Sequence, residues 1–269
     1  MSWQTRLIFR PIRLDPHRHM TPGYSKTVPQ PDSAAPKDHQ VRNMFSRIAR
    51  TYDLLNRVLS FGQDQYWRKY AIGKLSIASP GEVIDLCGGT GDMTFQLLKQ
   101  RPEDQATLTD FALPMLSIAR KRMESNGSCA EVACADALQL PFLSERFDAA
   151  MCAFGIRNWR DVEVGLKEVH RLLKHEGEFV ILEFLRSGNR KVETIKKLYL
   201  RNILPWMGFL ASGNYRAYRY LVDSMEQFYS DEEFQAIIER NGFSISHKKR
   251  FFLGVCWCYV LKKTGERMG

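Results

Sequence analysis

A glycine-dense turn with an acid in front of it is the part of this chain best placed to bind a ligand. Residues 83–86 are apolar apart from Asp85, and a turn that contains Gly88, Gly89 and Gly91 follows them and opens a predicted helix. Glycines let the backbone adopt positive φ angles and let a ligand approach bare main chain. In an open α/β sheet such a turn lies at the carboxyl end of a strand, where these folds bind nucleosides.

The same turn favours a ligand that carries an ammonium group and no phosphate. From Gly89 the pattern is G-x-G-x-x-T, so Thr94 stands where the dinucleotide fingerprint has its third glycine. The sequence has no G-x-x-x-x-G-K-S/T loop to hold a phosphate. Asp110 closes the next predicted strand, where a carboxylate can accept both ribose hydroxyls. S-adenosylmethionine has these groups; an ordinary strand–turn–helix with solvated acids is the alternative.

Composition and charge indicate one sizeable α/β domain with an appended element. The chain has 269 residues, of which 44% are hydrophobic and 12% aromatic, as in a globular protein with a full core. Its net charge of +9 comes from basic residues mixed with acids along the chain. This distribution favours an anionic surface such as a membrane over a nucleic-acid groove, and no nucleic-acid-binding motif is present.

The six cysteines indicate a reduced chain without a metal ion. They show no C-x-x-C spacing, and four fall in predicted strands, which is typical of small buried hydrophobic residues in a reducing compartment. Cys256 and Cys258 lie on one predicted strand, and we expect their thiols on opposite faces, which argues against a shared metal.

Residues 1–36 differ in composition from the rest. They hold four arginines before residue 20 and more than half of the eleven prolines, and they show no regular period. This composition predicts a disordered extension in front of a domain of residues 37–269. A mitochondrial transit peptide is one alternative, because the stretch is rich in arginine and poor in acids. A true start at Met20 is the other.

The remaining residues alternate between strand and helix patterns. Helical periodicity at 37–61 and 65–75 precedes the first strand, so these helices can cover the cofactor site. Strands are predicted at residues 82–86, 106–110, 131–135, 147–154, 177–185, 244–247 and 251–262. Further helices are predicted at residues 92–100, 113–124, 161–173 and 231–241.

These elements predict an α/β protein with a Rossmann-like, seven-stranded fold of the S-adenosylmethionine-dependent methyltransferase type. In that version of the sheet the last strand inserts antiparallel. Residues 189–229, rich in aromatic and aliphatic side chains at helical spacing, interrupt the series after the fifth strand and are expected to form a helical lid.

Short motifs along the chain resemble one enzyme family. They occupy residues 41–45, 48–49, 52–56 (Y-D-L-L-N), 59–62, 85–92, 140–142, 154–158 (F-G-I-R-N), 182–184, 204–205 and 218–221. In this order they resemble the UbiE/MenG family, the C-methyltransferases of menaquinone and ubiquinone biosynthesis. The likeness covers about residues 40–262 and is specific, because F-G-I/L-R-N and Y-D-x-x-N are not shared by methyltransferases in general.

The resemblance implies contacts to S-adenosylmethionine from Thr90, Asp110, Asp136 and Ala137. The Asp136 carboxylate would meet the adenine amino group, and the neighbouring backbone would hold the ring. The family often has serine where this chain has Ala153, which leaves a backbone contact there. With the turn and its acid, the expected cofactor set is Asp85, Gly88, Gly89, Thr90, Gly91, Asp110, Asp136, Ala137 and Ala153.

Arg157, Asn158 and Tyr52 are the candidate catalytic residues. Arg157 follows the fourth strand where an acceptor would lie, and a cation near a phenol lowers its pKa by about 1–3 units, so we assign it to stabilising a phenolate. Asn158 and Tyr52 are candidate hydrogen-bond partners of the quinol oxygens. A salt bridge from Arg157 to Asp161 and a core position for Tyr52 are the alternatives, and no base is identified.

The resemblance implies methyl transfer to the ring of a polyprenylated quinol, foremost demethylmenaquinol, with the ubiquinone-pathway benzoquinol as a second acceptor. The apolar stretch 198–210 could line a channel for the prenyl tail and touch a membrane. We expect a cytoplasmic enzyme peripheral to the inner face of the membrane, or one in the mitochondrial matrix if residues 1–36 are a transit peptide. A homo-oligomer or biosynthetic complex stays open, and no nucleic-acid partner is expected. The rivals are another small-molecule methyltransferase and a non-catalytic quinone-binding subunit.

Overall fold

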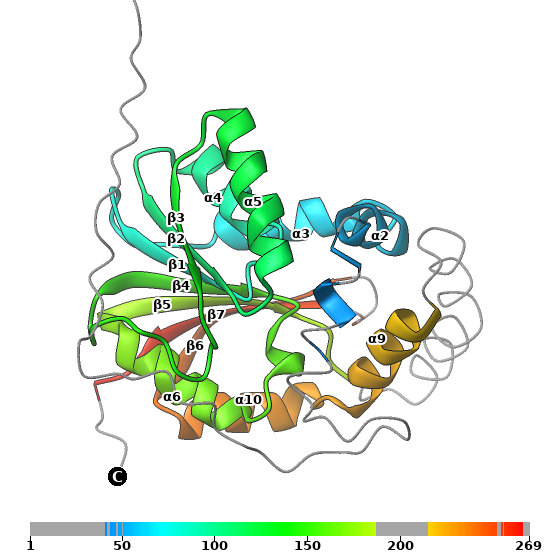
Figure 1. Cartoon of the computed structure of the whole chain (residues 1–269). Coiled ribbons are helices and arrows are strands. Elements are labelled where there is room, and N and C mark those ends of the chain that lie inside the picture. Colours follow the sequence, from blue (N-terminus) through cyan, green and yellow to red (C-terminus); the bar gives the residue numbers. More distant parts are fainter. Residues whose placement is uncertain are drawn as a thin grey trace, which may run out of the picture.

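The computed structural model describes residues 41, 44–46, 48–49, 51–186, 215–251, 254 and 256–265. Within them a single mixed sheet forms the centre of the molecule (Figure 1). Its strands are β1 (Glu82–Leu86), β2 (Gln105–Asp110), β3 (Ala130–Cys134), β4 (Phe147–Ala153), β5 (Leu173–Glu183), β6 (Phe243–Phe251) and β7 (Cys256–Lys263).

The strand order is β3-β2-β1-β4-β5-β7-β6, which confirms the predicted sheet. Strands β1 to β5 pair in parallel, and β7 inserts antiparallel between β5 and β6. The chain winds outward from β1 on one side and from β4 on the other. The crevice between the carboxyl ends of these two strands is where open α/β sheets bind ligands.

Helices cover both faces of the sheet (Figure 1). They are α2 (Tyr52–Leu59), α3 (Gln63–Ile72), α4 (Asp92–Gln100), α5 (Leu113–Asn126), α6 (Val162–Leu172), α9 (Tyr215–Gln227) and α10 (Asp231–Arg240), with a short 3₁₀ turn, η1 (Ile156–Asn158). Helices α3, α4 and α5 pack on one face, and α6 and α10 on the other. Figure 1 shows α2 and α9 beside the carboxyl ends of the parallel strands. None of the described helices is long and apolar enough to cross a membrane.

Strand β5 illustrates why the sheet has two cores. Phe179 and Ile181 pack in the cluster beneath α6 and α10, whereas Val180 and Leu182 pack in the cluster beneath α3 and α4. All four are fully buried. Successive side chains of a strand point to opposite faces, so a parallel strand covered on both sides needs a continuous apolar run.

Several predicted boundaries are wrong. The expected helix over residues 37–61 is broken by a turn at Ala49 and Thr51 before α2 begins. Strand β5 starts at Leu173, four residues earlier than predicted, and β6 continues to Phe251 instead of ending at His247. Strand β6 lies at the edge of the sheet, and alternate side chains along it are exposed. Residues 248–250, two lysines and an arginine, lay between two predicted strands and belong to β6, as charged residues at a sheet edge often do.

The expectation for Cys256 and Cys258 is also wrong. Both thiols are buried in the cluster that contains Trp67 and Val260. Side chains two residues apart on a strand share a face. No group of three or more metal-ligating side chains occurs among the described residues, these two included.

Two predicted segments fall wholly or largely beyond what the structure describes. The disordered extension, residues 1–36, lies outside the described residues, as do residues 189–214 of the lid with the apolar stretch 198–210. The described part of the predicted lid includes helix α9.

The close approach of Trp159 to Gly165 of α6 gives a stability prediction. A Cβ at Gly165 of α6 would come 2.2 Å from the Trp159 ring, whose side chain is buried. Overpacking of this kind typically costs about 1–3 kcal/mol. We expect Gly165→Ala to lower the free energy of unfolding by that amount, measured by urea denaturation. Gly73→Ala is the matched control, because its nearest neighbour lies at 3.4 Å; equal stability of the two variants would contradict the packing argument.

Candidate active site

A cavity opens at the carboxyl ends of β1 and β4, over the glycine turn. Its walls are Tyr52, Arg68, Asp85, Cys87, Gly88, Gly89, Thr90, Asp92, Met93 and Ala153. The structure therefore brings Tyr52 together with five of the predicted cofactor residues. Arg68, Cys87, Asp92 and Met93 are wall residues that the sequence analysis did not select.

The glycine turn can form only with glycine at two of its positions. A Cβ at Gly88 would lie 2.9 Å from Leu108 Cγ and 3.0 Å from the Asp85 carboxyl carbon. Gly91, the N-cap residue of α4, has a φ of 91°, a conformation that side-chain-bearing residues rarely adopt. The turn thus keeps bare main chain in the cavity wall at Gly88, directly beside Asp85.

Asp85 is fully buried, and one of its two carboxyl oxygens has no partner. Oδ2 accepts hydrogen bonds from the Thr94 backbone N–H (3.1 Å) and hydroxyl (2.6 Å). Oδ1 is buried without a hydrogen-bond partner. Burial raises the pKa of Asp85 to about 7, although the Thr94 bonds and the Arg68 charge act in the opposite direction. An unpaired buried acceptor in a cavity wall suits an ammonium group, so this feature fits S-adenosylmethionine.

Asp110 closes β2 beside the turn and is held at both oxygens. Oδ2 accepts the backbone N–H of Gly89 at 3.0 Å, and Oδ1 accepts that of Ala112 at 2.8 Å. Burial raises the pKa of Asp110 to about 6 against these two bonds. Each carboxylate oxygen can accept a second hydrogen bond. A fixed pair of acceptors at this position fits the two ribose hydroxyls.

Thr90, Asp136 and Ala137 sit differently from what the resemblance implies. The Thr90 hydroxyl lies at the cavity but donates to Asp53 Oδ1 at 2.5 Å. Asp136 is exposed, lies 3.3 Å from Arg160 Nη1 and accepts the Leu138 N–H at 2.9 Å. Asp136 and Ala137 follow β3 and, like Gly91 and Asp110, are not among the residues that line the cavity.

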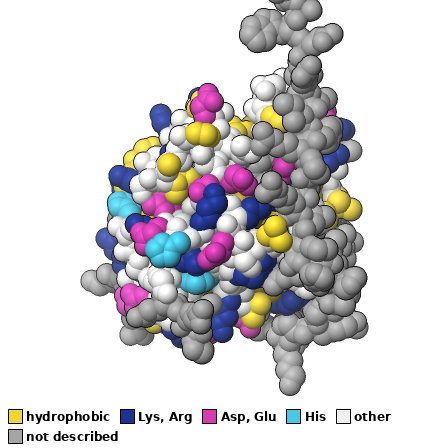
Figure 2. Space-filling model, turned by 90° about the vertical axis from the view of Figure 1, so that its left-hand side faces the viewer, with side chains coloured by type: hydrophobic (Ala, Val, Ile, Leu, Met, Phe, Trp, Pro, Cys, Tyr) yellow, Lys and Arg dark blue, Asp and Glu magenta, His cyan; other side chains and the backbone are white. Residues whose placement is uncertain are grey.

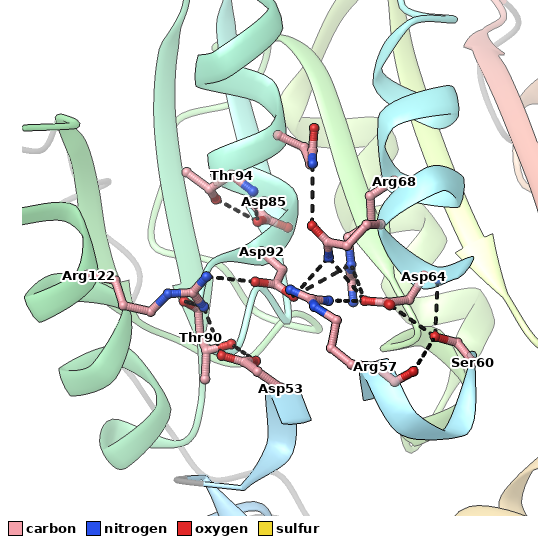
Figure 3. A network of polar contacts seen from close by, with 12 residues as sticks. Asp53, Arg57, Ser60, Asp64, Arg68, Asp85, Thr90, Asp92, Thr94 and Arg122 are labelled. Carbon is pink, nitrogen blue, oxygen red and sulfur yellow. Dashed lines mark hydrogen bonds and ion pairs between the residues drawn. The ribbon is translucent and has the colours of Figure 1, made fainter. Parts of the chain in front are cut away.

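Charged side chains fasten α2 and α3 to the turn (Figure 3). Arg122 of α5 donates to Asp53 Oδ2 at 2.9 Å, to Asp92 Oδ1 at 2.8 Å and to the Thr90 carbonyl at 3.0 Å. Arg57 of α2 donates to Asp92 Oδ2 at 3.2 Å and to Asp64. Asp53 was visible in the Y-D-L-L-N motif, but nothing in the sequence pattern distinguishes Arg57 or Arg122.

Arg157 is buried at the end of β4 and pairs with Glu183, not with Asp161. Its Nη1 donates to Glu183 Oε1 at 2.9 Å and to the Phe154 carbonyl, and its backbone N–H donates to Glu183 Oε2 at 3.1 Å. Its Nε is buried without a hydrogen-bond partner. Burial acts to lower the pKa of Arg157, but Glu183, Tyr52 and Tyr220 together more than offset it and the pKa is raised. Asp161 instead caps α6.

Two tyrosines and Asn158 surround the Arg157 charge. Burial raises the pKa of Tyr52, and the Arg157 guanidinium opposes that rise. Tyr220 of α9 shows the same two influences, with its pKa raised to about 12, and its hydroxyl donates to Asn158 Oδ1 at 3.2 Å. Tyr220 stood in a recognised motif without an assigned role, because its contact with Asn158 spans 62 residues of chain.

Comparisons with known proteins agree with this geometry. The model of the ubiE/COQ5 methyltransferase family matches residues 33–263. A demethylmenaquinone methyltransferase of Thermus thermophilus is 42% identical over 217 residues, 81% of this chain and 98% of that protein. The mitochondrial 2-methoxy-6-polyprenyl-1,4-benzoquinol methylase of Caenorhabditis elegans is 35% identical over 226 residues, 82% of this chain and 79% of that protein. A crystal structure of a SAM-dependent methyltransferase from Thermotoga maritima, 18% identical, matches with a TM-score of 0.58 over 82% of this chain and 99% of that one, a likeness of fold alone.

The raised pKa of Asp85 predicts a pH-dependent stability. Its folded-state pKa of about 7 exceeds the ordinary 3.8, so between these values the folded chain holds a proton that the unfolded chain lacks. Stability from this group is therefore lost as the pH rises through that window. We expect the free energy of unfolding of ligand-free Asp85→Asn, measured by urea denaturation, to gain about 1–3 kcal/mol relative to that of wild type as the pH rises from about 5 to about 8. Parallel stability curves for the two proteins would show that Asp85 titrates normally.

Proposed function

The chain belongs to the ubiE/COQ5 methyltransferase family, and from that premise we propose that it methylates a ring carbon of a polyprenyl quinol with S-adenosylmethionine as donor. The observation that carries this proposal is the position of Tyr52. It lines the cofactor cavity and also lies within the electrostatic reach of Arg157. Tyr52 is thus a wall residue of the cofactor cavity that interacts with Arg157, which supports adjoining sites for donor and acceptor, as methyl transfer requires.

The residues in and around the glycine turn would bind the methyl donor. Asp85 Oδ1 would hold the ammonium group, Asp110 the ribose hydroxyls, and the bare main chain at Gly88 would allow close approach of the ligand. When bound, S-adenosylmethionine supplies an electrophilic methyl group. The protein does not need to activate this group chemically, so its contribution is to orient it and to exclude water.

Arg157 would activate the acceptor by favouring ionisation of a ring hydroxyl, which makes the ring electron-rich. A phenol with a pKa near 10 needs a depression of roughly 3 units to be half ionised at neutral pH, and a nearby cation typically gives about 1–3. Glu183 neutralises part of the Arg157 charge, so the arginine alone falls toward the low end of that range. The unpaired Nε is a donor that a phenolate oxygen could satisfy. Asn158, already bonded to Tyr220, is placed to contact the second ring oxygen.

Demethylmenaquinol is the acceptor we favour, with the ubiquinone-pathway benzoquinol second. The Thermus and Thermotoga demethylmenaquinone methyltransferases are 42% and 39% identical to this chain, and the Caenorhabditis benzoquinol methylase 35%. The test is a competition between short-chain demethylnaphthoquinol and benzoquinol acceptors, with the products identified by mass spectrometry. It tests both the choice of acceptor and the proposal that a quinol is methylated at all. Faster methylation of the naphthoquinol supports the favoured acceptor. No methylation of either ring would refute the quinol proposal itself.

A peripheral position on an anionic membrane would bring the enzyme to its lipid acceptor. Leu54, Phe61 and Tyr66, on or between the helices that border the cavity, are 56%, 66% and 50% exposed, and Lys69 and Lys74 are exposed nearby in the chain. Figure 2 shows another face, at the left of Figure 1 and away from α2, where charges of both signs are interleaved. We place the protein on the inner, cytoplasmic face of a membrane, or in a mitochondrial matrix. Sedimentation with anionic but not neutral vesicles supports this placement, and no sedimentation with either argues against it.

Arg157 gives a pH-dependent test of the mechanism. Removing Arg157 alone would leave Glu183 buried without its partner, which costs about 3–5 kcal/mol, so Arg157→Met is combined with Glu183→Gln. We expect the double variant to lose about 10- to 1000-fold of single-turnover rate at neutral pH and to recover part of it at alkaline pH, where the phenol ionises unaided. Arg157→Lys keeps the charge and should lose less. Glu183→Gln alone is the control. If the pH–rate profile of the double variant runs parallel to that of wild type, Arg157 has a structural role only.

A further inference from the structure

Arg68 of α3 is a buried cation with an unused donor in the cavity wall. It is 4% exposed, and its Nε has no hydrogen-bond partner. The nearest acids, Asp64 and Asp92, lie 3.8 Å and 3.9 Å from Nε, within ion-pair range but too far for hydrogen bonds (Figure 3). A buried donor without a partner is costly, so a native structure that keeps one at a cavity needs a reason for it.

The unpaired donor lies in the same cavity as the unpaired acceptor of Asp85. Both residues line the walls around Gly88 and Gly89, and each keeps one buried polar atom without a partner. A donor of positive charge and an acceptor of negative charge in one small cavity complement an α-amino acid group, which presents a carboxylate and an ammonium on the same carbon.

We propose that Arg68 binds the α-carboxylate of S-adenosylmethionine, while Asp85 binds its α-ammonium. This assignment rests on the proposed function, because it presupposes that S-adenosylmethionine occupies the cavity. It adds a recognition residue that comes from α3 and not from the glycine turn.

The other arginines of the network are less suited to this task. Arg57 and Arg122 each donate to two aspartates, and neither lines the cavity. Arg68 is further fixed by its guanidinium, which lies 5.2 Å from the centre of the Phe154 ring. Such stacking covers the face of the guanidinium and leaves its N–H edge for an anion.

Charge around the cavity agrees with the ligand as a whole. Among the residues of the cavity wall, one arginine, Arg68, stands against two aspartates, Asp85 and Asp92. The surplus is one negative charge when all are ionised. S-adenosylmethionine carries a sulfonium, an ammonium and a carboxylate, and therefore one net positive charge.

The test compares two ligands that differ only in the carboxylate. Titration calorimetry of the full chain with S-adenosylmethionine and with its decarboxylated analogue gives an affinity ratio for each variant. A charge-assisted hydrogen bond predicts that wild type binds S-adenosylmethionine about 10- to 100-fold more tightly than the analogue. In Arg68→Met we expect this ratio to fall to within about threefold, while binding of the analogue is retained.

Two further variants complete the test. Arg68→Lys keeps the charge if Arg68→Met fails to fold, and it should lower the ratio because the ammonium cannot reproduce the planar guanidinium. Arg57→Met alters the same pair of acids from outside the cavity and should keep the wild-type ratio. A wild-type ratio near one, or an unchanged ratio in both Arg68 variants, would overturn the assignment. Quinol methylation by wild type is scored separately, so the assignment can fail while the proposed function stands.

Discussion

The Asp85 carboxyl group is fully buried in the sheet, yet only one of its oxygens has hydrogen-bond partners. Burial of a carboxylate without full compensation disfavours its charged form, which is why its pKa rises to about 7. A bound cation would remove that penalty. The ligand-free protein therefore keeps a destabilised group in place at the point where a positively charged ligand has most to gain, an arrangement typical of binding sites.

Ion pairs around the glycine turn connect the proposed cofactor site to the helices that carry Tyr52 and Arg68. Helices α2 and α3 carry Tyr52 and Arg68 into the cavity wall, and each is tied to Asp92 by an ion pair, α2 through Arg57 and α3 through Arg68 (Figure 3). Asp92 is the first residue of α4, so the start of that helix, the turn and the two covering helices form one connected unit. Because partly buried ion pairs resist salt screening better than exposed ones, this unit should hold at physiological ionic strength.

Much of the fold could be predicted from sequence because its signals are local. The bounds of β1 and α4 agree with the predicted ones, since an apolar run, a glycine turn and an amphipathic stretch each report on neighbouring residues. Edge strand β6 was predicted too short because three consecutive charged residues, Lys248, Lys249 and Arg250, interrupt its apolar positions. For the site, the turn and its acids were identified, whereas Arg68, Glu183 and Tyr220 were not assigned roles. Their partners lie many residues away, as the 26-residue separation of Arg157 and Glu183 shows, and a pattern read along the chain cannot reveal such contacts.

The pKa of Asp85 is the most direct test of the proposed cofactor site. It can be measured by carboxyl-carbon NMR in protein labelled at aspartate, with Asp85→Asn to assign the signal. We predict a pKa near 7 in the ligand-free protein, and a clear fall when S-adenosylmethionine or S-adenosylhomocysteine places an ammonium group beside the free oxygen. A ligand-free value near that of an ordinary aspartate, or a raised value that does not move on binding, would contradict the claim that this carboxylate anchors the cofactor.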